Sequence, residues 1–170
     1  MRAPPVLLPT RARGELGRAI RACTPRSKLE LACDTAAVPP IEDLDDMLRM
    51  LSPRAHAGTF SFVTVDRLSP DLDPIMMFRE DEGLTLVVST EDAARAGLAS
   101  ETAMGWITLE VQSSLVGVGL TAAVSTALAA AGIACNVVAA YHHDHVFVPA
   151  SMTDAAVAIL HALSNARRDA

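Results

Sequence analysis

Residues 106–148 read WITLEVQSSLVGVGLTAAVSTALAAAGIACNVVAAYHHDHVFV, and this stretch indicates the fold. It begins with alternating apolar and polar residues, as in a half-buried strand. Valine and leucine then recur at every fourth position, which predicts an amphipathic helix, and two β-branched segments follow. The expected elements are a strand at 106–111, a helix from Val116 to Gly132, strands at 133–140 and 145–148, and a helix at 152–163, with Ser151 as its N-cap.

The preceding half of the chain gives a related pattern. Its expected elements are a helix at 41–51, strands at 59–65, 75–78 and 84–88, and a short helix at 90–96 capped by Thr90. The order strand-helix-strand-strand-helix in the second half is typical of ferredoxin-like folds, in which helices cover one face of an antiparallel sheet. We therefore predict an α+β protein with tandem ferredoxin-like repeats. The final strand of a complete repeat is not visible, and the other half is one source for it.

Four segments resemble a bacterial family of tandem ACT-domain proteins of unknown function. They are 74–88 (PIMMFREDEGLTLVV), 113–122 (SSLVGVGLTA), 131–141 (AGIACNVVAAY) and 143–149 (HDHVFVP). The resemblance covers residues 41 to about 163. It implies the domain boundaries that we expect: an extension at 1–40, a first ACT-like repeat at 41–100, a second at 101–165 and a tail at 166–170.

The resemblance also implies a function. ACT repeats are usually regulatory modules that bind amino acids between two repeats, at the loop after the first strand, the start of the next helix and the following strand. In this sequence the corresponding ligand-binding positions are Ser113, Ser114, Leu115, Gly117, Val118, Gly119, Leu120, Asn136 and Val137. No attached enzyme domain is visible for such a module to regulate.

Two interpretations of the Ser113–Leu120 segment are open. A helix that begins there presents free N–H groups and partial positive charge, which suit a ligand carboxylate. Alternatively, Gly117 and Gly119 only let the helix pack closely on the sheet. Two interpretations of Asn136 are also open: its amide either contacts a ligand or faces solvent at a sheet edge.

Histidines 142, 143 and 145 surround Asp144 in the expected second hairpin. His143 and His145 are weak metal-ligand candidates, because imidazole pairs bind zinc or copper. A site needs three or four ligands, so an ordinary hairpin turn is the simpler interpretation. We expect no metal, no cofactor and no catalytic residue. The acidic segment 79–83 is interpreted as a solvated turn rather than a cation site.

Composition limits the partners. The net charge of −6 disfavours nucleic acid. Three cysteines at 23, 33 and 135 fit no disulfide or metal framework, which favours a reducing, cytoplasmic location. The uncharged run 111–141 is long enough for a membrane span but too rich in Ala, Gly, Ser and Thr, so we reject a span. Residues 1–40 are expected to be disordered, a presequence, or the result of a misplaced start site.

The expected function is therefore a regulatory module that binds an amino acid, in a homodimer. A structural or partner-binding protein with a vestigial pocket is the main alternative, since open sheet edges favour dimers. A metal-dependent enzyme using the His142–His145 cluster is a third.

Overall fold

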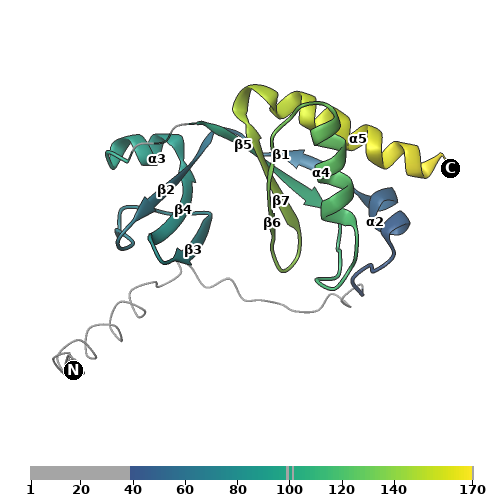
Figure 1. Ribbon diagram of the computed structural model, residues 1–170, viewed down its shortest axis with the longest axis horizontal. Coiled ribbons are helices and arrows are strands. Elements are labelled where there is room, and N and C mark those ends of the chain that lie inside the picture. Colours follow the sequence, from purple (N-terminus) through teal and green to yellow (C-terminus); the bar gives the residue numbers. More distant parts are fainter. Residues whose placement is uncertain (1–38, 99, 101, 170) are drawn as a thin grey trace, which may run out of the picture. The chain divides into compact units, whose positions relative to one another are not determined.

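The computed structural model describes residues 39–98, 100 and 102–169 (Figure 1). Residues 1–38, which hold most of the expected extension, lie outside the described residues. The first half forms α2 (Leu44–Met50), β1 (Ser52–Ala55), β2 (Phe60–Val65), β3 (Met76–Glu80), β4 (Gly83–Ser89) and α3 (Thr90–Arg95). The second half forms β5 (Met104–Glu110), α4 (Leu120–Ala130), β6 (Asn136–Ala139), β7 (Asp144–Pro149), a 3₁₀ turn η2 (Ala150–Met152) and α5 (Thr153–Arg168).

The strands form a sheet in the order β3-β4-β2-β5-β7-β6, with β1 also paired to β5. Every pairing between these strands is antiparallel. The two halves of the sheet are joined at a single pair, Phe60 of β2 opposite Met104 of β5. The predicted α+β class with antiparallel, ferredoxin-like strand order is confirmed.

Strand β1 explains where the second half obtains its fourth strand. Ser52 lies opposite Glu110 and Ala55 opposite Ile107, so β1 extends the β6-β7-β5 sheet along the outer side of β5. This segment carries no strand signal of its own, because it has only four residues and contains Pro53. The other half of the chain therefore supplies the missing strand.

The main hydrophobic core lies between the β6-β7-β5-β1 sheet and three helices, α2, α4 and α5, which Figure 1 shows grouped beside these strands. Met47, Leu48 and Leu51 of the α2 region are at most 1% exposed and pack in the same cluster as Leu128 of α4 and Leu160 of α5. Helix α2 begins the expected first repeat in sequence but is buried in the second half.

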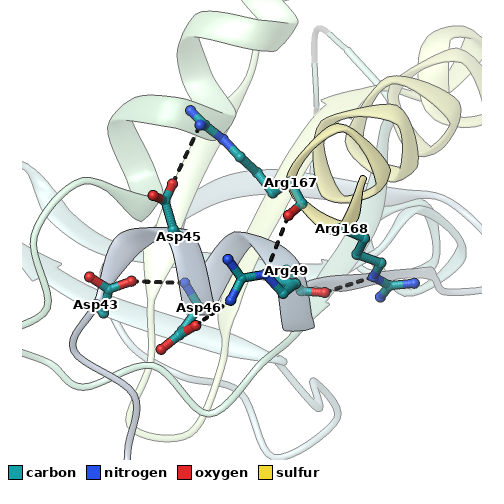
Figure 2. A network of polar contacts seen from close by, with 6 residues as sticks. All are labelled: Asp43, Asp45, Asp46, Arg49, Arg167 and Arg168. Carbon is teal, nitrogen blue, oxygen red and sulfur yellow. Dashed lines mark hydrogen bonds and ion pairs between the residues drawn. The ribbon is translucent and has the colours of Figure 1, made fainter. Parts of the chain in front are cut away.

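Polar contacts also join α2 to the end of α5 (Figure 2). The Arg49 Nε–H donates to the carbonyl oxygen of Arg167 at 3.3 Å, and the Arg168 Nε–H donates to the carbonyl oxygen of Arg49 at 2.8 Å. Each guanidinium thus satisfies a carbonyl that the last turn of the other helix leaves free. Arg167 also lies 3.4 Å from Asp45. These contacts hold the C-terminus of α5 against α2.

Three predicted helix starts are wrong. Helix α4 begins at Leu120 rather than Val116, because Gly119 has φ +107° and cannot continue a right-handed helix. The N-cap of α3 is Ser89, not Thr90: the Ser89 hydroxyl accepts the Asp92 N–H at 3.0 Å. Ser151 does not cap α5, since the chain forms a 3₁₀ turn there first.

Cys135 packs half-buried at the edge of the main core, which is typical of a free cysteine acting as a small apolar side chain. Cys23 and Cys33 lie outside the described residues. Within the described part of the chain, no helix combines the length and the apolar character needed to cross a membrane.

Candidate functional site

The loop between β5 and α4 is held by the segment that enters α2. The Ile41 N–H donates to the Gln112 carbonyl at 2.8 Å, and the Ser114 N–H donates to the Ile41 carbonyl at 2.9 Å. The Gly117 N–H then closes a turn onto the Ser114 carbonyl at 2.9 Å. These bonds fix the loop close to α2 at the carboxyl end of β5.

Both glycines in this loop are required by packing. A Cβ on Gly117 would lie 3.0 Å from the Ser114 carbonyl oxygen and 3.3 Å from the Met47 Cε. A Cβ on Gly119 would lie 2.9 Å from a Leu44 methyl group, at a positive φ that other residues rarely adopt. The glycines are therefore no evidence of a ligand by themselves. A bulky residue at Gly119 would disturb the start of α4 as well as any site.

A cavity of about 60 Å³ lies beneath this loop. Its walls combine loop residues with the ends of two strands and with α2 and α4. They are formed by Met47, Ser113, Ser114, Leu115, Gly117, Leu120, Thr121, Ala139 and Asp144. The lining residues therefore include three that carry a hydroxyl group and one that carries a carboxylate, beside apolar side chains.

Asp144 is the charged residue of this cavity. It begins β7 and is only 6% exposed. The Thr121 hydroxyl donates to Asp144 Oδ2 at 3.5 Å, a long and weak hydrogen bond. Burial raises the pKa of the Asp144 carboxyl above its ordinary value, and the Thr121 contact and the neighbouring histidines only partly oppose this.

Five of the nine predicted ligand-binding residues line this cavity: Ser113, Ser114, Leu115, Gly117 and Leu120. Val118 is exposed and does not line it. Asn136 and Val137 are not brought to the loop within one chain. Val137 packs against the helix-covered core, so its neighbour Asn136 faces the opposite side of the sheet, about 10 Å along β6 from Ala139.

The sequence analysis overlooked Met47, Thr121, Ala139 and Asp144. Asp144 was interpreted as a turn residue, but it starts a strand whose alternate residues Val146 and Val148 are fully buried in the main core. The residues that face the main core alternate along β7, and extending this alternation two residues back from Val146 places Asp144 on the core face. This alternation was the signal in the sequence that could have identified the buried acid.

A wider, open hollow of about 510 Å³ lies between α2, α4 and α5. It is lined mainly by small and apolar side chains, namely Leu44, Leu48, Ala123, Ala127 and Leu163, and also by Gly119 and Arg167. Gly119 thus belongs to this hollow and not to the cavity under the loop.

The other face of the sheet carries a cluster of histidine and tryptophan. The His56 ring stacks on Trp106 with centroids 3.4 Å apart, and its Nε2 lies 2.7 Å from the Thr108 hydroxyl. The Trp106 Nε1–H donates to Nδ1 of His145 at 3.1 Å, and Thr108 Oγ1 is also 3.1 Å from this nitrogen. His145 is therefore engaged in the sheet, while Nδ1 of His143 lies 3.2 Å from the Val111 carbonyl oxygen.

No group of three or more His, Cys, Asp or Glu residues placed to hold a metal ion occurs in the described ranges. His143 and His145 thus have no third ligand among the described residues.

We expect stability to fall as the pH drops below about 6.5. Burial lowers the pKa of both His56 and His145 in the folded protein. As the pH falls below about 6.5, the histidines of the unfolded chain are therefore protonated before those of the folded protein. The stabilisation that is present above pH about 6.5 is lost as the pH falls towards the folded pKa values. Urea unfolding from pH 7.5 to 5.5 measures this. His145→Asn keeps an acceptor for Trp106 and should flatten the pH dependence, whereas His142→Asn, at an exposed position, should leave it unchanged. An equal slope in all three proteins would contradict this assignment.

Comparison with known families identifies the fold. One ACT-domain model matches residues 39–105, and a second ACT-domain model matches residues 101–162. A solved structure from Vibrio cholerae is 44% identical, with a TM-score of 0.65, and the match covers 71% of this chain and 95% of that one. That protein is described as one of unknown function and a possible transport protein. The chain belongs to the ACT-domain family, and it carries two ACT domains in tandem.

More distant structures share the fold. A protein from Agrobacterium tumefaciens is 14% identical with a TM-score of 0.59, covering 67% of this chain and 89% of that one. A structure of aspartokinase alpha and beta subunits is 13% identical with a TM-score of 0.50, covering 67% and 97%. The comparison with curated proteins gave no match.

The predicted resemblance to tandem ACT-domain proteins is confirmed. ACT domains are regulatory modules that bind small molecules, and neither match is to a catalytic domain.

Proposed function

We propose that this protein is a regulatory module whose ligand is an amino acid, bound at the Ser113–Leu120 loop. The observation that carries the proposal is the cavity beneath that loop, at the strand-to-helix junction of the second ACT domain. The loop N–H groups that have no hydrogen-bond partner in the described part of the chain supply donors for a ligand carboxylate. Among the described residues, no acceptor is hydrogen-bonded to the N–H of Leu115, Val118 or Gly119.

We propose further that the protein acts as a homodimer. Strand β6 is an outer strand of the sheet, and its free edge is available for pairing with a second copy. A second copy paired there brings another Asn136 to the assembly, which would account for its place among the predicted ligand residues. The proposal retains two repeats, at 41–100 and 101–165. It also retains a reducing, cytoplasmic location for the protein, in which the half-buried thiol of Cys135 stays free.

The test is a thermal-shift screen of the full chain against the twenty amino acids and common small carboxylic acids. A ligand at a hundred times its dissociation constant stabilises by about 2.7 kcal/mol, which is a rise in Tm of about 5–15 °C for a domain of this size. Leu115→Glu places an acid at the cavity and should abolish the response. Leu68→Glu makes the same exchange at an exposed position in the first half and should not.

The exposed loop favours one alternative. Leu115, Val116 and Val118 are 64%, 75% and 82% exposed, which is unusual for three apolar side chains within four residues. Such a patch also suits a partner-binding protein with a vestigial pocket. A flat ligand screen, together with self-association in sedimentation that Leu115→Glu weakens, would favour this alternative over ligand sensing.

A further inference from the structure

The charge of Asp144 has no counter-ion among the described residues. No Lys, Arg or His nitrogen lies within 4.0 Å of its carboxylate in the described part of the chain, and its contact with Thr121 is a neutral hydroxyl at 3.5 Å. Its neighbours His143 and His145 direct their Nδ1 atoms to Val111, and to Trp106 and Thr108. An acid that is 94% buried therefore faces the cavity with its charge uncompensated.

A largely buried carboxylate without a counter-ion is costly, because burial removes part of its hydration. The raised pKa of Asp144 reflects that cost. The cost disappears when a cation enters the cavity, whereas a second carboxylate there would be repelled. The whole segment from Val111 to Tyr141 contains no charged residue, so no neighbouring side chain of this segment can supply the cation.

The cavity has the size and the acceptor atoms to hold one small cationic group. Its volume of about 60 Å³ holds an ammonium group but not the body of a ligand. An ammonium group has three N–H donors and no acceptor. The Asp144 carboxylate and the hydroxyls of Ser113, Ser114 and Thr121 are oxygen acceptors on the cavity walls.

The rim of the cavity is apolar. Leu115 lines it, Val116 and Val118 are exposed beside it on the same loop, and the 77% exposed Tyr141 lies in the β6–β7 hairpin at the same end of the sheet. A ligand whose amino group entered the cavity would place its remaining atoms along these side chains.

We infer that the ligand of this site is a primary amine with an apolar body, whose ammonium group enters the cavity and takes Asp144 as its counter-ion. The inference rests on the proposed function for the location of the site and adds a place for the amino group. The amino group points inward, and the carboxylate of an amino acid lies outside, on the loop N–H groups.

The experiment uses the full chain as wild type, Asp144→Asn and Asp81→Asn. Asp81 lies at the exposed tip of the β3–β4 hairpin and loses the same charge. The probes are the twenty L-amino acids, N-acetyl-L-leucine, 3-methylbutylamine and 4-methylpentanoate at millimolar concentrations, measured by thermal shift and titration calorimetry. We expect 3-methylbutylamine and apolar amino acids to bind, and N-acetyl-L-leucine and 4-methylpentanoate not to bind. Asp144→Asn should weaken binding by about 30-fold or more, and Asp81→Asn should not change it.

Asp144→Asn also reports on folding. Because the amide has the same volume and no charge, the unliganded variant should melt at or above the wild-type temperature at neutral pH. A lower Tm combined with lost binding would overturn the inference, since it would show a structural role for the carboxylate.

The outcomes separate the two proposals. Binding of 3-methylbutylamine that Asp144→Asn abolishes, with no amino acid responding, would support the amine site and overturn the amino-acid ligand. An amino acid that binds wild type and Asp144→Asn equally would support the proposed function and overturn the amine site. No response to any amine or amino acid would overturn both. Stabilisation by sodium or potassium chloride alone would overturn the amine in favour of an inorganic cation.

Discussion

A fragment that begins at residue 101 is expected to remain unfolded, even though it contains the whole second ACT-domain match. The fragment lacks Met47, Leu48 and Leu51, which are at most 1% exposed in the core of that half. Losing one buried side chain of this size costs about 2–5 kcal/mol, and losing three costs about as much as a domain's total stability of 5–15 kcal/mol. The fragment also lacks β1 and so leaves the outer side of β5 unpaired.

Far-ultraviolet circular dichroism and urea unfolding measure this outcome. The matched control keeps residues 39–58 and 102–169 and replaces residues 59–101 with a short Gly/Ser linker, so that α2 and β1 are restored. This variant should unfold cooperatively. A cooperative transition in the fragment from residue 101 would show instead that the predicted boundary near residue 101 separates two independently folding units.

The same packing explains what the sequence could predict. Local patterns predicted the strands that became β2, β4, β5 and β7, because β-branched residues and alternation are properties of the segment itself. The pattern did not predict β1, which is stabilised by its pairing with β5 rather than by its own composition. A helix that begins one repeat in sequence and packs in the other is likewise a tertiary feature.

The sequence predicted the loop of the candidate site but not its charged residue. Residues Ser113–Leu120 were identified from the strand-to-helix junction and from the family resemblance, and five of them line the cavity. The spacing of Val116 with Leu120 was misleading. The apolar periodicity extends back to Val116, but the helix cannot begin before Leu120 because Gly119 has a positive φ. Asp144 was missed because a hairpin explained it locally, and its burial depends on α4, which lies more than ten residues earlier in the chain.

Replacing Phe147 with alanine is expected to lower the free energy of unfolding by about 3–5 kcal/mol. Phe147 is 2% exposed and lies on the face of β7 opposite the helices, where it packs with Phe60, Val87 and Met104. Its ring meets Phe62 edge to face, with centroids 5.2 Å apart. The side chain thus joins strands of both halves, which backbone pairing connects at only one residue pair.

Phe78→Ala is the matched control, because Phe78 is 64% exposed on the edge strand β3 and should cost less than about 1 kcal/mol. Urea unfolding followed by far-ultraviolet circular dichroism and Trp106 fluorescence distinguishes two results. If Phe147 supplies packing energy only, the midpoint falls with an unchanged slope. If it is the main connection between the halves, Phe147→Ala splits the circular dichroism signal into two transitions, and Trp106 fluorescence, which senses the contact of Trp106 with Phe60 of β2, follows only one of them. Equal effects of Phe147→Ala and Phe78→Ala would show that the aromatic contact between the halves does not form in solution.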